Sequence, residues 1–160
     1  MTGVVLREVT PTNFAECIGL QVEPAQRSFV ATNMKSLAEA KVNSTLYPLA
    51  IYDEVALGDD PGNHNMVGFT MYELTAGVGF ILRLMIDARY QRKGYGRASM
   101  IEVIRRLRCY PEVQLIATSH RRENLAAADL YQGLGFEPWQ VPFDSPDPDE
   151  VYLALTTNTP

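Results

Sequence analysis

The sequence predicts a single α/β domain in which a central mixed, mostly antiparallel β-sheet is flanked by α-helices and contains one β-α-β crossover. The chain has 160 residues, about the size of one domain. Residues 46–53, 65–74 and 78–87 are β-rich runs, and residues 75–77 (TAG) between the last two are a hairpin signal. An amphipathic helix and the apolar residues 113–118 follow, which is the order of a right-handed crossover.

The N-terminal part supplies one strand and two short helices. Residues 4–9 are β-rich, and Thr10 and Pro11 carry the signal of a helix start, with Thr10 as the cap and Pro11 in the first turn. Ser36 and Glu39 have the spacing of a capping box before a second helix. We expect both helices to lie between the first strand and the strand over residues 46–53.

The C-terminal half has clearer periodicity. Residues 96–108 are amphipathic, and residues 113–118 (VQLIAT) are apolar on both faces, as in a central parallel strand. Residues 124–133 predict a helix, and Gly135 stands where a left-handed helix stop is needed. The chain after Gly135 and residues 150–156 are expected to form the last strands.

Composition and charge exclude several classes of protein. The chain is 46% hydrophobic and 21% charged, with a net charge of −5. No apolar stretch reaches about 18 residues, so no membrane span is expected. The N-terminus shows no basic flank before an apolar core, so a cytoplasmic location is expected. The negative charge argues against nucleic acid as a partner and is compatible with a cationic substrate.

The cysteines and histidines predict no metal site. Cys17 and Cys109 are too far apart for a metal motif or a redox pair, so we expect two reduced, mostly buried thiols. His64 lies in a polar segment and is expected to be solvated. His120 follows a predicted strand.

The segment QRKGYGRA at residues 91–98 follows an apolar strand and opens an amphipathic helix. Free N–H groups and the positive end of the dipole at a helix N-terminus favour phosphate, and Gly94 and Gly96 allow the backbone to come close. A dinucleotide fingerprint would need a third glycine where Ser99 stands, and the Gly-Lys-Ser/Thr of a P-loop is absent. From the glycines alone, a tight turn remains an open alternative.

Two motifs together resemble those of the GNAT superfamily of N-acetyltransferases. Gln91-x-x-Gly94-x-Gly96 resembles its pyrophosphate-binding motif, and the predicted element order is also that of the family. About 30 residues later the second coenzyme-side motif is matched by Asn124, Ala127, Leu130, Tyr131, Leu134, Gly135 and Phe136. Residues 29–40 and 84–91 are similar to bacterial spermine/spermidine (diamine-type) acetyltransferases.

The resemblance implies a reaction and a co-substrate. Acetyl-CoA would donate its acetyl group directly to a primary amine of a polyamine, spermidine or spermine, in a ternary complex. Another acceptor (an antibiotic, an amino acid or a protein amine) and a CoA-binding module without turnover are the alternatives. Relatives are often dimers, so a homodimer is one open arrangement. No metal is expected.

The resemblance also implies the coenzyme site. In the family, the strand before the glycines carries a bulge and splays from the next strand, which opens a slot for the coenzyme. The expected coenzyme-binding residues come from this strand, from the glycine segment and from the second motif: Leu84, Met85, Ile86, Gln91, Arg92, Lys93, Gly94, Tyr95, Gly96, Arg97, Asn124 and Tyr131. Arg121 or Arg122 would contact a coenzyme phosphate or belong to a surface charge run.

Tyr131 matches the tyrosine that protonates the leaving thiolate in the family, with a phenol pKa near 10. Its alternative is a core aromatic residue, and Asn124 either caps its helix or binds the coenzyme. The base is less clear, because residues 80–86 (FILRLMI) contain no carboxylate. Either a water chain removes the amine proton or a carboxylate from another element does, and Glu73 is the candidate.

A polyamine also needs a carboxylate that holds its distant ammonium group. The candidates on elements expected to wall the acceptor site are Glu23, Glu39 and Glu73. Each has the alternative of being a solvated surface residue.

Overall fold

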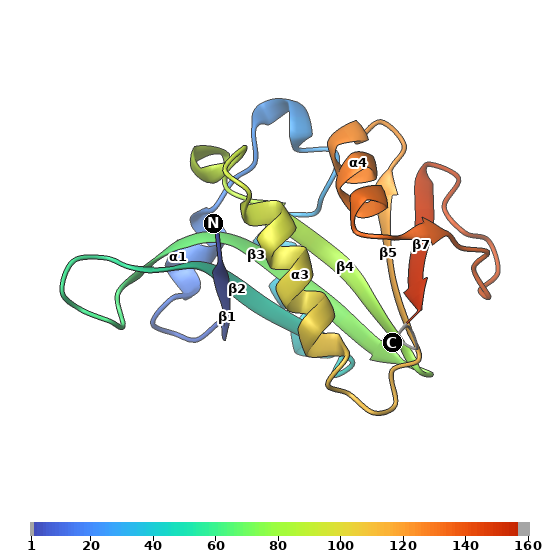
Figure 1. Ribbon diagram of the computed structural model, residues 1–160, viewed down its shortest axis with the longest axis horizontal. Helices are drawn as coiled ribbons and strands as arrows, with labels where there is room; N and C mark the ends of the chain where they lie inside the picture. The colour runs from blue at the N-terminus through green and yellow to red at the C-terminus, as the bar shows by residue number, and fades with distance from the viewer. Residues whose placement is uncertain (1, 157–160) are drawn as a thin grey trace.

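The computed structural model describes residues 2–156, whose strands form one seven-stranded mixed sheet in the order β1-β2-β3-β4-β5-β7-β6 (Figure 1). The strands are β1 (Val4–Glu8), β2 (Leu46–Ala56), β3 (His64–Thr75), β4 (Val78–Ile86), β5 (Leu115–Arg121), β6 (Glu137–Pro138) and β7 (Glu150–Thr156). Only β4 and β5 pair in parallel, and they are joined by a helix, so the predicted fold class and crossover are confirmed.

Helices cover both faces of this sheet. They are α1 (Phe14–Gly19), α2 (Asn33–Val42), α3 (Tyr95–Leu107) and α4 (Leu125–Gly133), with two single turns, η1 (Pro24–Gln26) and η2 (Ala88–Tyr90). One core lies between the sheet and α3 with α4, and a second lies on the α1 and α2 face (Figure 1). Residues 66–72 of β3 are all buried, because this strand is central and covered on both faces.

Two predicted helix starts were wrong, and each was displaced by local hydrogen bonds. Residues 10–13 form a turn in which the N–H of Thr10 donates to Asn13 Oδ1 at 2.7 Å, so α1 begins only at Phe14. The hydroxyl of Thr32 accepts from the N–H of Lys35 at 3.2 Å and caps α2. Ser36 therefore lies inside α2 and is buried, instead of capping it.

The predicted hairpin and helix stop are confirmed by positive backbone φ angles. Ala76 and Gly77 have φ of 50° and 79° between the paired residues Thr75 and Val78, the geometry of a two-residue hairpin turn. Gly135 has φ of 96° just after α4, where a side chain would be strained.

Two expectations about single residues were wrong. Cys17 is buried, but Cys109 is exposed beyond the end of α3. His64 is not simply solvated, because its ring nitrogens lie 2.8 Å from the carbonyl oxygen of Asp53 and 2.9 Å from that of Pro61. Within residues 2–156, no helix is long and apolar enough to cross a membrane, and no cluster of three metal-ligating side chains occurs.

Candidate functional site

The sheet opens between β4 and β5, and this fork is the centre of the site. The two strands pair only from Val78 to Ile81, opposite Leu115 to Thr118, and β5 then continues along β7. Opposite β3, the register skips Leu82, which makes a bulge in β4 where the strands part. The hydroxyl of Thr118 donates to the carbonyl oxygen of Ile81 at 2.9 Å at the same point. The expected bulge and splay are thus confirmed.

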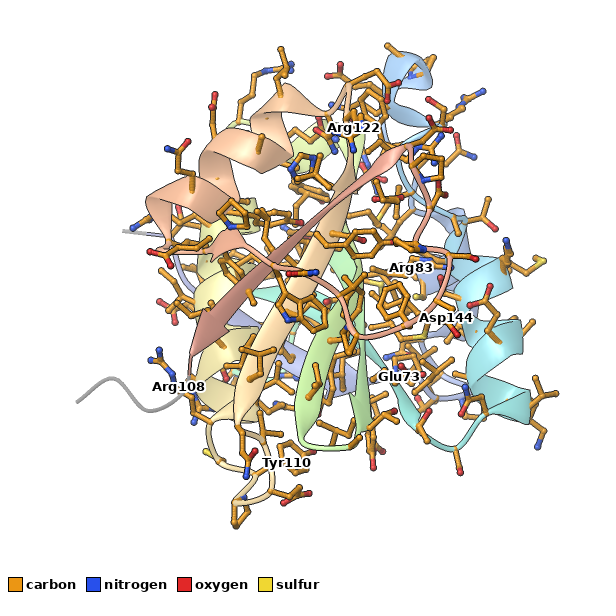
Figure 2. All side chains as sticks on the ribbon, turned by 90° about the vertical axis from the view of Figure 1, so that its right-hand side faces the viewer. Glu73, Arg83, Arg108, Tyr110, Arg122 and Asp144 are labelled. Carbon is orange, nitrogen blue, oxygen red and sulfur yellow. The ribbon has the colours of Figure 1, made fainter. Side chains whose placement is uncertain are left out.

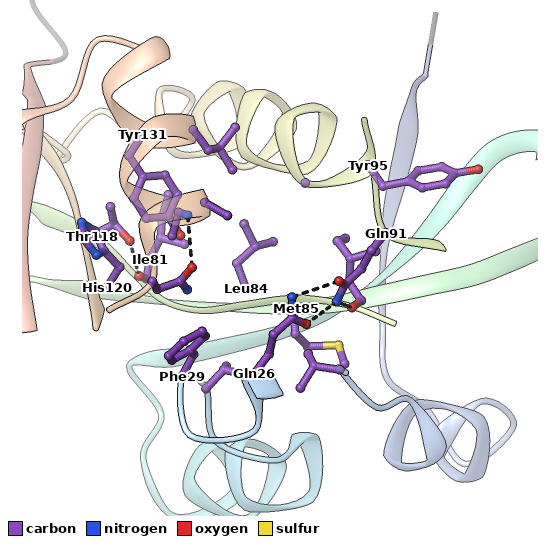
Figure 3. A pocket seen from close by; sticks show the side chains of 18 of the residues that line it. Gln26, Phe29, Ile81, Leu84, Met85, Gln91, Tyr95, Thr118, His120 and Tyr131 are labelled. Carbon is purple, nitrogen blue, oxygen red and sulfur yellow. Dashed lines mark hydrogen bonds between the residues drawn. The ribbon is translucent and has the colours of Figure 1, made fainter. Parts of the chain in front are cut away.

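A cavity of about 420 Å³ occupies this fork. Its walls are the far end of β4, the glycine segment, the end of β5, α4 and the loop between α1 and α2. Figure 3 shows Thr118, His120 and Tyr131 at one end, Gln91 and Tyr95 at the other, and Leu84 and Met85 between them.

The glycine segment ends in an uncapped helix N-terminus. Gly94 is the N-cap of α3 with φ of 88°, and no side chain in the described part of the chain caps the helix. The first intrahelical bond of α3 runs from the N–H of Ala98 to the carbonyl oxygen of Gly94, so the preceding N–H groups have no acceptor within the helix. An ideal Cβ on Gly96 would meet only Leu130, at 3.8 Å, so protein packing does not require glycine there. The open space suits a ligand that approaches the backbone closely.

Gln91 joins this segment to two other elements. Its Nε2 donates to the carbonyl oxygen of Ile86 at 2.9 Å and to Gln26 Oε1 at 2.7 Å, and Gln26 Nε2 donates back to Gln91 Oε1 at 3.1 Å. The side chain of Gln91 thus fixes the end of β4 against η1.

Asp87, just after β4, connects the strand to the loop after α1 and to η2. Asp87 accepts from the N–H of Gln21 at 3.0 Å and from Arg89 Nε at 2.8 Å. Burial raises the pKa of Asp87, but these hydrogen bonds outweigh it and hold the pKa below its usual value.

Arg92 forms an ion pair of 3.1 Å with Glu23, so the predicted acceptor carboxylate Glu23 instead contacts the glycine segment.

Most of the predicted coenzyme residues line the fork cavity. Ten of the twelve do so: Leu84, Met85, Ile86, Gln91, Arg92, Gly94, Tyr95, Gly96, Asn124 and Tyr131. Lys93 and Arg97 are exposed outside the lining, with Lys93 Nζ 5.9 Å from the ring centre of Tyr90. Tyr95 contributes its backbone, because its hydroxyl donates to Asp53 at 2.6 Å, which raises the pKa of Tyr95 to about 12.

Tyr131 reaches the cavity from α4. Its side chain is buried, with the rings of His120 and Phe136 centred 6.0 and 5.8 Å from its own. Burial raises the pKa of Tyr131 to about 12; the hydroxyl of Thr118 lowers it and the charge of Glu150 raises it further. The expected value near 10 was therefore too low, and the phenol keeps its proton throughout the neutral range. Tyr131 thus packs in the core and also lines the cavity, and its role as a proton donor stays a prediction.

Asn124 is confirmed as a helix cap. Its Oδ1 accepts from the N–H of Ala127 at 3.2 Å at the start of α4. The residue also lines the fork cavity.

A second cavity, of about 650 Å³, lies on the α2 side of the sheet and meets the first at the fork. Five residues line both cavities: Phe29, Val30, Leu82, Ser119 and His120. Glu73, Asp147 and Glu150 bring carboxylates to the second cavity, and Lys35, Arg83 and Arg121 bring cations. Figure 2 shows Glu73 and Arg83 on this side of the molecule.

Of the predicted acceptor carboxylates, only Glu73 lines this second cavity. Its Oε2 accepts from the hydroxyl of Thr45 at 3.2 Å, and no ion pair with it occurs within residues 2–156. Glu39 does not line the second cavity, but it lies 3.3 Å from Arg83 and 3.9 Å from Lys35, which do. Glu39 therefore neutralises cations of the cavity instead of facing it.

Sequence reasoning missed Glu150. Glu150 begins β7 directly after an acidic stretch, and the sequence alone gives no reason to distinguish it from these neighbours. Arg121 lies 3.5, 3.8 and 3.9 Å from Asp147, Asp149 and Glu150, and Arg122 Nε donates to the carbonyl oxygen of Pro148 at 2.7 Å. Neither arginine lines the fork cavity, and both contact the segment before β7.

Comparisons with known proteins agree with this geometry. The model of the acetyltransferase (GNAT) family matches residues 27–136. The spermine/spermidine N(1)-acetyltransferase of Bacillus subtilis is 31% identical over 143 residues, which cover 84% of this chain and 88% of that protein.

Two solved structures share the fold at low sequence identity. Spermidine N-acetyltransferase from Vibrio cholerae, in complex with CoA and spermine, has a TM-score of 0.72 at 14% identity, covering 96% of this chain and 95% of that one. Ribosomal-protein-S18-alanine N-acetyltransferase from Escherichia coli has a TM-score of 0.68 at 18% identity, covering 98% and 96%.

Proposed function

The chain belongs to the acetyltransferase (GNAT) family and is an N-acetyltransferase that uses acetyl-CoA, and we propose that its acceptor is a primary amine of a polyamine such as spermidine or spermine. The observation that carries the proposal is the second cavity, which meets the coenzyme fork and is lined by Glu73, a carboxylate that forms no ion pair with any residue from 2 to 156. The similarity to a spermine/spermidine acetyltransferase over most of both chains supports it.

The coenzyme side works mainly through the backbone. The free N–H groups at the start of α3 would hold the pyrophosphate, and Gly94 and Gly96 leave room for it. Within the described strands, residues 82–86 of β4 have no partner on the β5 side, so their backbone would pair with the pantetheine arm as an added strand does. Holding the thioester beside the acceptor in this way contributes up to several kcal/mol.

The transfer itself makes one bond and breaks one. The neutral amine nitrogen bonds to the acetyl carbonyl carbon, the carbon–sulfur bond breaks, and the sulfur leaves with the electron pair. Tyr131 would donate its phenolic proton toward this sulfur, and the proton lost by the new amide nitrogen restores the phenol. Because the pKa of Tyr131 is about 12, the main contribution of its phenol would be the hydrogen bond that stabilises the thiolate until this proton is transferred.

The acceptor side holds a polycation by charge. Glu73 lines the second cavity away from the fork, on the hairpin strand β3, where it would bind the distant ammonium while another amine reacts. Glu23 and Glu39 are less suited to this task, because Arg92, Arg83 and Lys35 already neutralise them. The homodimer remains a prediction.

Thiol release from acetyl-CoA with a panel of amines tests this proposal. Spermidine and spermine should have higher specificity constants than a short monoamine, an amino acid or a lysine peptide. Equal or lower values would refute the polyamine acceptor and leave an acetyltransferase for another amine. No release with any amine would favour a module that binds CoA without turnover.

A further inference from the structure

Proton removal from the acceptor amine has no candidate on β4, because residues 80–86 contain no carboxylate. We propose that Glu150, the first residue of β7, is the carboxylate that binds the reacting ammonium and accepts its proton. The inference rests on acetyl transfer to an amine, and not on which amine is preferred.

The position of Glu150 follows from strand pairing. Glu150 pairs with Arg121, and Tyr152 pairs with Ser119, across the antiparallel ladder of β5 and β7. Paired residues point to the same face of a sheet, and all four of these residues line the second cavity. Ser119 also lines the fork cavity, so Glu150 lies on the acceptor side beside the junction of the two cavities.

One oxygen of Glu150 lacks a hydrogen-bond donor in the described part of the chain. Its Oε2 is buried and makes no hydrogen bond to any residue within the described range 2–156. Its Oε1 lies 3.9 Å from Arg121, which is too far for a hydrogen bond. A buried carboxylate oxygen without a donor is destabilising. An ammonium group, with three donors and a positive charge, would satisfy it.

The charges around Glu150 favour a cation at this oxygen. Arg121, its partner on β5, and Asp147 in the preceding segment line the cavity with it, and His120 of β5 and Tyr131 of α4 interact with it electrostatically. The other charged residues of the cavity are Lys35 on α2, Glu73 on β3 and Arg83 on β4. Arg121 is shared among three carboxylates. One guanidinium cannot neutralise three carboxylates, so part of their negative charge remains to attract a cationic substrate.

Burial also gives Glu150 the properties of a base. Burial raises the pKa of Glu150 above its usual value, although Arg121 and Ser119 oppose the shift. A carboxylate with a raised pKa accepts a proton from an ammonium more readily than an ordinary glutamate does. Turnover should then fall as the pH falls through this raised pKa, because protonated Glu150 cannot accept another proton.

Glu150 and Tyr131 also influence each other electrostatically across the fork. The negative charge of Glu150 contributes to the raised pKa of Tyr131. An ammonium bound at Glu150 would offset this charge and lower the pKa of Tyr131, which makes the phenol a better donor to the leaving sulfur. Substrate binding on one side of the sheet would thereby prepare the donor on the other.

The proton balance of the step is complete. The ammonium nitrogen gives one proton to Glu150 Oε2 and becomes a neutral amine, which attacks the acetyl carbon as described above. Glu150 then releases its proton to solvent, and the carboxylate is ready for the next ammonium. One proton per turnover therefore appears in solution, beside the thiol and the acetylated amine.

The test compares Glu150→Gln with the control Asp149→Asn. Both changes remove one carboxylate near Arg121 and keep the shape of the side chain, but Asp149 does not line the cavity. We expect Glu150→Gln to lower kcat by about 10²-fold or more for every amine that the enzyme accepts, with acetyl-CoA affinity by calorimetry unchanged. The acid limb of its kcat profile should disappear. Asp149→Asn should keep both kcat and the limb.

A shortened carboxylate separates the base from a structural role. Glu150→Asp should keep the acid limb at reduced kcat, and this variant decides the matter if Glu150→Gln does not bind acetyl-CoA. A normal kcat or an unchanged acid limb in Glu150→Gln would overturn the assignment. All assays use whichever amine reacts best with the unmodified enzyme. A preference for an amine other than a polyamine would therefore refute the proposed acceptor and leave the assignment of Glu150 as the base unaffected.

Discussion

The two sides of the fork are built in different ways. On the proposed coenzyme side, one stretch of residues 91–98 would supply the cradle through backbone N–H groups at the start of α3. On the acceptor side, the cavity is lined by side chains from α2, β3, β4, β5 and β7 and from the loops between elements. A contiguous backbone site gives a motif that can be read from sequence. A site assembled from many elements does not, because its residues meet only in the folded chain.

The difference predicts how each side responds to substitution. The coenzyme side should depend on the small size of its glycines and little on nearby charges, since Lys93 and Arg97 lie outside the cavity lining. The acceptor side should depend on individual charges.

The largest expected effect is on the coenzyme side. Gly96→Val should abolish acetyl-CoA binding in calorimetric titration, because the added side chain would fill the space that the pyrophosphate needs. Gly96 is a cleaner test than Gly94, whose positive φ would strain any side chain.

Gly19→Val is the matched control, because Gly19 is exposed at the end of α1 and an ideal Cβ there meets nothing within 4 Å. It should bind acetyl-CoA normally. A folded Gly96→Val protein with normal affinity would contradict the placement of the pyrophosphate.

The next effect lies at the junction of the two sides. Tyr131→Phe should lower kcat by about 10²-fold while acetyl-CoA affinity is nearly kept, because only the hydrogen bond to the leaving sulfur is lost. Tyr110→Phe, which loses a hydrogen bond of 3.0 Å to Tyr72 far from the cavity, should leave kcat unchanged. Equal kcat values in the two variants would reduce Tyr131 to a packing residue.

The sequence predicted the parts of the molecule that depend on local patterns. The crossover, the hairpin at Ala76 and Gly77, the stop at Gly135 and the cradle all follow from spacing or from a backbone conformation that few residues adopt. The start of α1 was missed because Asn13 Oδ1 accepts from the N–H of Thr10 and holds residues 10–13 in a turn. The start of α2 was missed because Thr32 caps the helix before Ser36 is reached.

The acceptor side was only partly predictable, and for a physical reason. The sequence alone does not distinguish Glu23, Glu39 and Glu73. In the structure, ion pairs with Arg92, Arg83 and Lys35 neutralise the first two, and of the three only Glu73 lines the second cavity. Glu150 is important because β7 pairs beside β5, a long-range fact that its own neighbours in sequence do not carry.

A smaller effect should appear at Glu73. Glu73→Gln should raise KM for spermidine a few-fold and leave KM for a short monoamine unchanged, because only the longer substrate reaches this carboxylate. Moderate salt should raise the same KM selectively, since exposed charge pairs are screened over roughly 8–10 Å. Glu137→Gln, at an exposed glutamate of β6, is the control. An equal rise for both amines in Glu73→Gln would remove the anchor role.

In the proposed reaction, coenzyme and polyamine meet at the fork between β4 and β5. Calorimetric titration with a conjugate in which spermidine is joined to CoA through an acetyl bridge tests it directly. We expect the conjugate to bind about 10²-fold more tightly than CoA, because both cavities are occupied at once. Glu73→Gln should remove part of this gain without changing CoA binding. A conjugate that binds no more tightly than CoA would contradict the claim.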